Sequence, residues 1–324
     1  MEKEILLKAE SISKSFGGVK ALQNVSFELQ KGEVLSVIGE NGAGKSTLMK
    51  IVAGALKNDE GKIYFQGEEL SLHSPLDAVK TGISIVYQEP NIFADMSVLE
   101  NIFMGNETVS RGGTIQWTKM YDEAVEALRL VGLDGKILHL TMSELSIGNQ
   151  QLVLIARGIY KKCKVLILDE PTSILSHNES EKLFEIIADL KNKGVSIMYI
   201  SHRIPEILRI SDNIIVLRDG CLTGTLSPKE ISEETIITAM SGRKINMSVY
   251  KERKQSEKPI LEVKHLSLKP VYKDVSFDVR PGQILGMYGL VGAGRSEIAR
   301  AIFGETNAES GQIFFEGEDI SRIN

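Results

Sequence analysis

The chain has 324 residues, of which 42% are hydrophobic and 25% are charged, and its formal net charge is −5. This composition is typical of a globular protein of about two domains, and the acidic balance does not favour a nucleic-acid-binding surface. No apolar run approaches the ~20 residues that span a bilayer, and Cys163 and Cys221 have neither metal-ligand spacing nor a disulfide framework. The charged start, Met1–Glu4, leads into a strand-like run, so we expect no signal peptide and a partner protein for any role at a membrane.

A glycine-rich loop lies between a predicted strand and a predicted helix near the start of the chain. Val34–Ile38 is an apolar run typical of a buried strand, and the pattern of Ser46–Ala53 predicts a helix. Between them the sequence fits G-x-x-x-x-G-K-[ST], the phosphate-binding loop. Its glycines let successive N–H groups point at one phosphate chain, Lys45 supplies a charge to the outer phosphates, and Ser46 supplies a hydroxyl to Mg²⁺. The nucleotide-binding residues expected here are Gly39, Glu40, Asn41, Gly42, Ala43, Gly44, Lys45, Ser46 and Thr47.

The rest of the first 242 residues alternates strands and helices, which predicts a mostly parallel α/β core. We expect strands at 83–87, 164–168 and 195–200, an amphipathic helix at 179–193, and an antiparallel pair at 214–217 and 221–225. The stretch from about 91 to 160 has a mostly helical pattern, which indicates an inserted helical subdomain.

Two acidic residues follow the apolar strand that ends at Leu168. Asp169 is expected at the carboxyl end of the sheet beside the phosphate loop, where it can hold Mg²⁺ directly or through water. Glu170, one residue further, can orient or deprotonate an attacking water. With the phosphate loop upstream, the sequence therefore predicts a magnesium-dependent nucleotide site rather than a strand that happens to end in two acids.

An internal repeat relates residues 25–67 to residues 275–317 at a constant offset of 250. Glycines held in register over this distance imply the same turns in the same order. The chain thus carries one complete domain, about 1–242, and the opening of a second, 259–324. The polar run 243–258 has no apolar periodicity and indicates a linker.

The second copy differs from the first at its phosphate loop, Gly289–Ser296, where Arg295 stands in the place of Lys45. Arginine keeps the charge, but its planar guanidinium is bulkier than an ammonium and does not simply replace it. The aromatic loop that precedes it is also shorter, by about five residues, at 267–272. We therefore expect a weaker second nucleotide site.

The segment Leu145–Gln150 reads Leu-Ser-Ile-Gly-Asn-Gln and resembles the signature motif of ABC-type ATPases, and it ends 19 residues before Asp169, as in that family. Taken alone, Ser146 would be a helix N-cap. The resemblance implies instead that Ser146 and Gly148 meet a nucleotide phosphate across a dimer. The resemblance to ABC-type ATPases covers the whole chain. Within that family the chain is most similar to the double-domain ATPases of monosaccharide importers, the ribose, galactose, arabinose and xylose group. Those proteins are roughly one domain longer, so this chain resembles a member that stops within its second ATPase domain.

The resemblance implies roles for further residues. Phe16 is similar to the aromatic that stacks on adenine, and His202 is similar to the switch histidine that contacts the γ-phosphate. Gln88 is similar to the glutamine that senses Mg²⁺ and the γ-phosphate. The catalytic group implied is Glu170, His202 and Gln88, and the groups near Mg²⁺ are Ser46, Gln88 and Asp169. The implied fold is a P-loop NTPase with a mostly parallel core sheet, an antiparallel β subdomain and an inserted helical subdomain.

The function implied by the resemblance is an ATP-binding and ATP-hydrolysing subunit, with ATP and Mg²⁺, that energises sugar import. The partners implied are membrane permease subunits, indirectly a sugar-binding protein, and a second ATPase domain in an ATP-dependent dimer, at the cytoplasmic face of the cell membrane. The segment 88–107 is expected to face the permease, where Phe93, Met96 and Phe103 are either contacts or local core. Two alternatives remain: a soluble ABC ATPase acting on ribosomes or DNA, which the short linker and acidic balance disfavour, and a shortened product that binds nucleotide without coupling.

Overall fold

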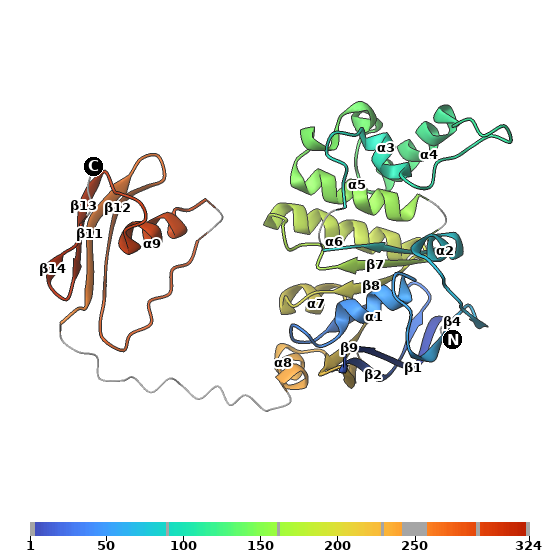
Figure 1. The fold of residues 1–324 in the computed structure, drawn as a ribbon, viewed down its shortest axis with the longest axis horizontal. Coiled ribbons are helices and arrows are strands. Elements are labelled where there is room, and N and C mark those ends of the chain that lie inside the picture. Colours follow the sequence, from blue (N-terminus) through green and yellow to red (C-terminus); the bar gives the residue numbers. More distant parts are fainter. Residues whose placement is uncertain are drawn as a thin grey trace. The chain divides into compact units, whose positions relative to one another are not determined.

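The computed structural model describes residues 4–88, 91–160, 163–227, 230–241, 258–289 and 292–321. The chain separates into two compact units, 1–245 and 246–324, and each is considered by itself (Figure 1). The linker predicted at 243–258 lies outside the described residues except for Lys258. Within the described ranges, no helix has the length and apolar character needed to cross a membrane.

The centre of the first unit is a six-stranded sheet in which five neighbouring strands are parallel and the sixth, at one edge, is antiparallel. The strand order is β10-β9-β3-β8-β7-β6. This arrangement confirms the mostly parallel core that the alternating pattern predicted. The strands are β3 (Val34–Ile38), β6 (Ile83–Val86), β7 (Val165–Asp169), β8 (Ser196–Ile200), β9 (Asn213–Arg218) and β10 (Cys221–Leu226).

Both faces of the five parallel strands are largely buried, which explains why these strands are continuous apolar runs rather than alternating ones. In β3, Val34 and Ile38 contribute to one hydrophobic core, whereas Leu35 and Val37 contribute to the other. The first core lies against the helical part of the unit and the second against its antiparallel sheet. Because the faces are covered, polar side chains can gather only beyond the ends of the strands. The carboxyl ends of all five parallel strands lie at the same end of the sheet.

The antiparallel β subdomain has the strand order β2-β1-β4-β5. Its strands are β1 (Ile5–Phe16), β2 (Val19–Gln30), β4 (Glu60–Phe65) and β5 (Glu68–Glu69). Helix α1 (Lys45–Val52) follows the phosphate loop, and α2 (Pro75–Thr81) leads into β6.

Three helices form the helical part, in the upper region of the first unit in Figure 1: α3 (Val98–Phe103), α4 (Trp117–Leu130) and α5 (Ile147–Ile159). Short 3₁₀ turns at Gly135–His139 and Met142–Glu144 join α4 to α5. The remaining helices of this unit are α6 (His177–Asn192), α7 (Ile204–Ile210) and α8 (Glu233–Ser241). Helices α3 and α6 begin at serine–glutamate capping boxes, which satisfy the free N–H groups of the first turn.

The second unit repeats the β subdomain and the first helix. Its sheet has the order β12-β11-β13-β14, which corresponds to β2-β1-β4-β5. The elements are β11 (Leu261–Leu268), β12 (Tyr272–Val279), α9 (Arg295–Phe303), β13 (Ser310–Phe315) and β14 (Glu318–Asp319). Leu268 pairs with Tyr272, whereas the corresponding residue Lys14 pairs with Leu22, so three residues separate these paired positions in the second unit and seven in the first. Four of the seven continue the strands of the first unit, as the pairs Ser15–Lys20 and Phe16–Val19. The segment between these paired positions is thus shorter by four residues, close to the five expected.

The segment 284–288 is the counterpart of β3, yet it is not a strand. In the first unit β3 is held between β8 and β9. In the described residues of the second unit no strand pairs with 284–288, and Ile284 and Tyr288 are 84% and 98% exposed. The apolar sequence of this segment is thus that of a central strand, but the described residues of the second unit supply no neighbouring strand for it.

Candidate functional site

The phosphate loop occupies the turn between β3 and α1, and close backbone contacts require two of its glycines. A Cβ atom on Gly39 would lie 2.2 Å from the Leu217 carbonyl oxygen on β9. Gly44, with a φ of 101°, would bring a Cβ atom within 2.5 Å of the Ala21 carbonyl oxygen on β2. The loop is thus held tightly between the central sheet and the β subdomain, with its N–H groups at the start of α1.

Lys45 lies across the phosphate loop. Its Nζ atom donates to the carbonyl oxygens of Gly39 and Glu40 at 2.8 and 2.9 Å, and the residue is 7% exposed. Burial lowers the pKa of this ammonium, while the nearby carboxylates of Glu170 and Asp169 act in the opposite direction. A desolvated cation at this place gains strongly from an anionic ligand.

Asp169 is the last residue of β7, and its side chain reaches α1. The pKa of Asp169 is raised, first by burial and then by the neighbouring charge of Glu170. The Ser46 hydroxyl lies near the Asp169 carboxylate and favours its ionised form, which opposes the effect of burial on the pKa. The structure thus brings together a hydroxyl and a carboxylate from segments more than a hundred residues apart.

Glu170 connects the ends of three strands. Its backbone has a φ of 46°, in the left-handed region that is unfavourable for a non-glycine residue, and its N–H donates to the Ile200 carbonyl at 2.9 Å. Its Oε1 atom is 3.1 Å from Nδ1 of His202, and its Oε2 atom accepts from Nε2 of Gln88 at 3.2 Å. Gln88 and His202, the other two residues expected from the sequence to be catalytic, therefore both contact Glu170.

These side chains border a cavity of about 580 Å³. The residues that line it are Ala21, Asn41, Gly42, Gly44, Lys45, Ser46, Thr47, Gln88, Glu170 and His202. Ala21, on β2, has no chemical signature in the sequence, and only the packing of the β subdomain against the loop could identify it.

Six of the twelve residues expected to bind nucleotide do not line this cavity: Gly39, Glu40 and Ala43 of the phosphate loop itself, and Phe16, Ser146 and Gly148 outside it. Phe16 is at the end of β1, 48% exposed, with Nζ of Lys14 5.6 Å from its ring centroid. Ser146 and Gly148 lie at the start of α5, in the helical part. The adenine role of Phe16 and the phosphate role of Ser146 and Gly148 stay predictions.

The signature segment has a defined local structure. Ser146 is the N-cap of α5, and its hydroxyl accepts from the Asn149 N–H at 3.3 Å. The N–H of Gly148 donates to the Glu179 carboxylate of α6, and a Cβ atom on Gly148 would lie 2.0 Å from Oε1 of that carboxylate. A side chain at position 148 would therefore have to displace the Glu179 side chain, whereas Ile147 is 55% exposed.

The donor atoms beside the phosphate loop fit Mg²⁺. A hydroxyl, an amide oxygen and a carboxylate are hard oxygen donors, supplied by Ser46, Gln88 and Asp169. Over the described parts of the chain, no group of three or more His, Cys, Asp or Glu side chains has a metal-binding arrangement. A magnesium ion here would consequently need phosphate oxygens and water to complete its coordination.

The second phosphate loop begins α9 in the same way, with Gly294 at a φ of 82° before Arg295. The Arg295 side chain lies over the start of the loop, because a Cβ atom on Gly289 would be 3.5 Å from its Cδ atom. Residues 290 and 291 of this loop are outside the described ranges.

Comparison with known proteins relates the whole chain to transport ATPases. The family model described as "ABC transporter" matches residues 22–173 and 272–324. The ribose import ATP-binding protein RbsA of Caldanaerobacter subterraneus subsp. tengcongensis is 42% identical over 317 residues, which cover 98% of this chain and 64% of that protein. RbsA of Clostridium perfringens (strain SM101) is 43% identical over 322 residues, 99% of this chain and 64% of that protein. The chain thus spans slightly less than two thirds of the length of these curated relatives.

Solved structures of single cassettes match the fold. A nucleotide-free ATP-binding cassette of an ABC transporter is 29% identical, with a TM-score of 0.63 over 73% of this chain and 95% of that one. A cassette in its ADP conformation gives a TM-score of 0.64 at 29% identity, over 74% of this chain and 99% of that one. The fold expected from the sequence is confirmed, and with the family match over both copies of the repeat, the chain belongs to the ABC transporter family.

Proposed function

We propose that the first unit binds Mg-ATP in the cavity beside the phosphate loop, hydrolyses it, and thereby energises a carbohydrate importer. The observation that carries this proposal is the convergence of Glu170, Gln88 and His202 at the open side of the loop. The names of the relatives, ribose import ATP-binding proteins, support the transport role. An ADP-bound structural relative supports a nucleotide as the ligand.

The proposed chemistry is mainly positioning and charge stabilisation. The N–H groups of the phosphate loop and Lys45 hold the β- and γ-phosphates, and Ser46 and Asp169 hold the Mg²⁺, which neutralises phosphate charge when bound. Glu170 orients the attacking water and accepts its proton, and His202 donates to the γ-phosphate. Ser146 and Gly148 of another ATPase domain close the site from the opposite side, which fits their distance from the cavity of their own unit.

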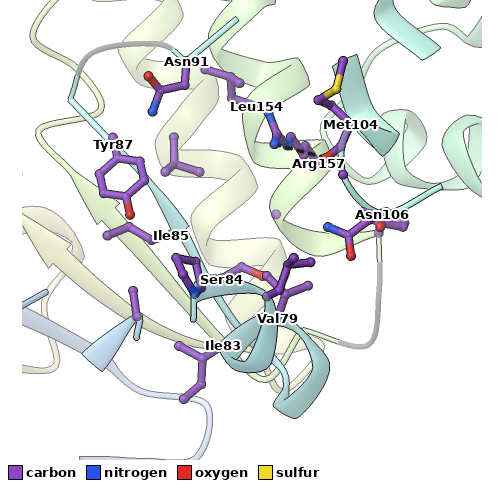
Figure 2. Close-up of a pocket in the computed structure, with 17 residues that line it drawn as sticks. Val79, Ile83, Ser84, Ile85, Tyr87, Asn91, Met104, Asn106, Leu154 and Arg157 are labelled. Atoms are coloured by element: carbon purple, nitrogen blue, oxygen red, sulfur yellow. Dashed lines mark hydrogen bonds between the residues drawn. The ribbon is translucent and has the colours of Figure 1, made fainter. Parts of the chain in front are cut away.

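We further propose that a permease subunit docks in a groove of about 240 Å³ between β6 and the helical part (Figure 2). Its floor is apolar, with Val79, Ile83 and Leu154, and its rim carries Asn91 and Asn106. The groove includes part of the segment 88–107 that the sequence indicated. Phe103, however, is fully buried and packs edge-on against Tyr160, with ring centroids 4.8 Å apart, so it belongs to the core.

Substitution of the two phosphate-loop cations tests the nucleotide site. Lys45→Ala should abolish most binding of Mg-ATP, because it removes the cation nearest the phosphates, whereas Arg295→Ala should change binding less than about threefold. Titration calorimetry with Mg-ATP and the intact chain measures both. Equal losses in the two variants, or no loss in Lys45→Ala, would contradict the proposal.

A further inference from the structure

Helix α7 places a buried carboxylate behind the proposed catalytic groups. Glu206 is 8% exposed and accepts hydrogen bonds from three hydroxyl groups. Thr172 Oγ1 lies 2.8 and 2.9 Å from its two carboxylate oxygens, and Tyr199 Oη and Ser201 Oγ lie 2.8 and 3.0 Å from Oε2. Nη1 of Arg203 is 3.3 Å from Oε1 and supplies a nearby positive charge.

The donors belong to the two loops that carry Glu170 and His202. Thr172 follows Glu170 by two residues, in a turn in which the Ser173 N–H donates to the Glu170 carbonyl at 3.1 Å. Ser201 immediately precedes His202, and its hydroxyl also accepts from the Arg203 N–H at 3.0 Å. A single carboxylate therefore holds the loops that follow β7 and β8, and it does so without lining the cavity itself.

The cluster needs an acceptor for each of the buried hydroxyls that donate to it. Thr172, Tyr199 and Ser201 are at most 2% exposed, so water does not replace a lost acceptor for their hydroxyls. Burial, and next the charge of Glu206, raise the pKa of Tyr199, which keeps the phenol protonated as a donor. All three hydroxyls lie within 3.0 Å of Oε2, and Thr172 and Nη1 of Arg203 also reach Oε1. An amide has a single acceptor oxygen for these donors, and its N–H₂ group in the place of Oε1 would face the Arg203 guanidinium, which is itself a donor.

We propose that Glu206 is a positioning residue, which holds Glu170 and His202 in contact for catalysis by bonding to the loop beside each of them. The proposal rests on the catalytic roles proposed above for those two residues. Their contact depends on the relative placement of the two loops, since the 3.1 Å between Nδ1 of His202 and Oε1 of Glu170 joins one loop to the other. Small displacements of such groups can cost about 100-fold in rate.

The chain offers a matched control in Glu33, another buried carboxylate. Glu33 is 1% exposed, and its oxygens accept from the Gln30 N–H at 2.6 Å and from Nδ2 of Asn213 at 2.5 Å. It precedes β3 and therefore lies at the end of the sheet opposite to the phosphate loop. Glu33→Gln perturbs a buried carboxylate network without touching either catalytic loop.

The test compares Glu206→Ala, Glu206→Gln and Glu33→Gln in the intact chain. The histidine ring signals are recorded by NMR without nucleotide, and the His202 signal among the five histidines is assigned from its loss in His202→Ala. We expect it to move by more than its line width in both Glu206 variants and to keep its place in Glu33→Gln. With ATP, kcat should fall about 10- to 100-fold in Glu206→Gln while KM changes less than about threefold, because the phosphate loop is untouched.

Each outcome separates this proposal from the proposed function. An unmoved His202 signal in the Glu206 variants overturns the positioning role, as does a kcat loss no larger than that of Glu33→Gln. If Glu206→Ala does not fold, Glu206→Gln decides by the same comparison. If the unmodified chain hydrolyses no ATP, or if Glu170→Gln hydrolyses it at the unmodified rate, the proposed function fails, while the nucleotide-free NMR comparison still decides the role of Glu206.

Discussion

At the scale of single residues, Asp169 sits in an environment that disfavours its own charge. It is 7% exposed, and its pKa is raised by burial and by the adjacent Glu170 carboxylate. An acid whose pKa is higher in the folded than in the unfolded state binds more protons when folded. Its ionisation therefore lowers the free energy of unfolding as the pH rises from the unfolded pKa of about 3.8 to the raised folded pKa.

Asp169→Asn should consequently stabilise the nucleotide-free chain at pH 7 while it removes a magnesium-binding group. An amide has the same shape, can accept from Ser46, and carries no charge to desolvate. We expect an unfolding temperature about 2–4 °C higher, which corresponds to about 1 kcal/mol in a domain of this size. Thermal scans without nucleotide and with Mg-ATP measure it, and the stabilisation by Mg-ATP should be lost.

Asp95→Asn, an exposed site before α3, is the control and should leave both scans unchanged. A lower unfolding temperature for nucleotide-free Asp169→Asn would show that the carboxylate stabilises the empty site, contrary to this account.

The sequence predicted the residues whose chemistry has a local pattern and missed those that act through packing. Lys45 and Glu170 stand in recognisable contexts, a glycine-rich loop and an apolar strand that ends in acids. Ala21 and Glu206 do not, because their importance comes from contacts with Gly44 and with Thr172, which are far away in the sequence. No periodicity or motif contains such contacts.

At the scale of elements, the groove between β6 and the helical part combines an apolar floor with a polar rim. Cysteines at Asn91 and Asn106 should form crosslinks to co-expressed permease subunits, and a cysteine at the exposed Glu126 on α4 should not. The two cysteines already in the chain should not interfere with the crosslinking. Burial raises the pKa of Cys163 to about 12, which keeps it as an unreactive thiol, and Cys221 can be replaced by serine. Mass spectrometry of the crosslinked membranes identifies the positions, and crosslinks from Glu126→Cys alone would place the partner elsewhere.

Strand and helix positions were largely predictable because each element has its own apolar period. The strand expected at 83–87 is β6 (Ile83–Val86), and the helix expected at 179–193 is α6 (His177–Asn192). The exception is 284–288, whose apolar sequence matches a strand although its residues form none in the second unit. A central strand of a parallel sheet needs neighbours on both sides, and these come from other parts of the chain.

At the scale of the whole molecule, the proposed function needs a signature segment from another ATPase domain to close the site. The 324 residues contain one signature segment, Leu145–Gln150, and its Ser146 and Gly148 do not line the cavity of their own unit. A nucleotide held by Lys45 and Ser46 can therefore meet a signature only on another ATPase domain. With this chain alone, that domain is the first unit of a second molecule.

Glu170→Gln tests this central claim most directly. The variant should bind ATP but not hydrolyse it, because an amide cannot take the proton of the attacking water, so the γ-phosphate remains to join two first units. We expect size-exclusion chromatography with light scattering to give the mass of a dimer with saturating Mg-ATP and that of a monomer with Mg-ADP, and a monomer in both for the double variant Lys45→Ala, Glu170→Gln. A Glu170→Gln chain that hydrolyses ATP at the unmodified rate, or one that stays monomeric with Mg-ATP bound, would contradict the account.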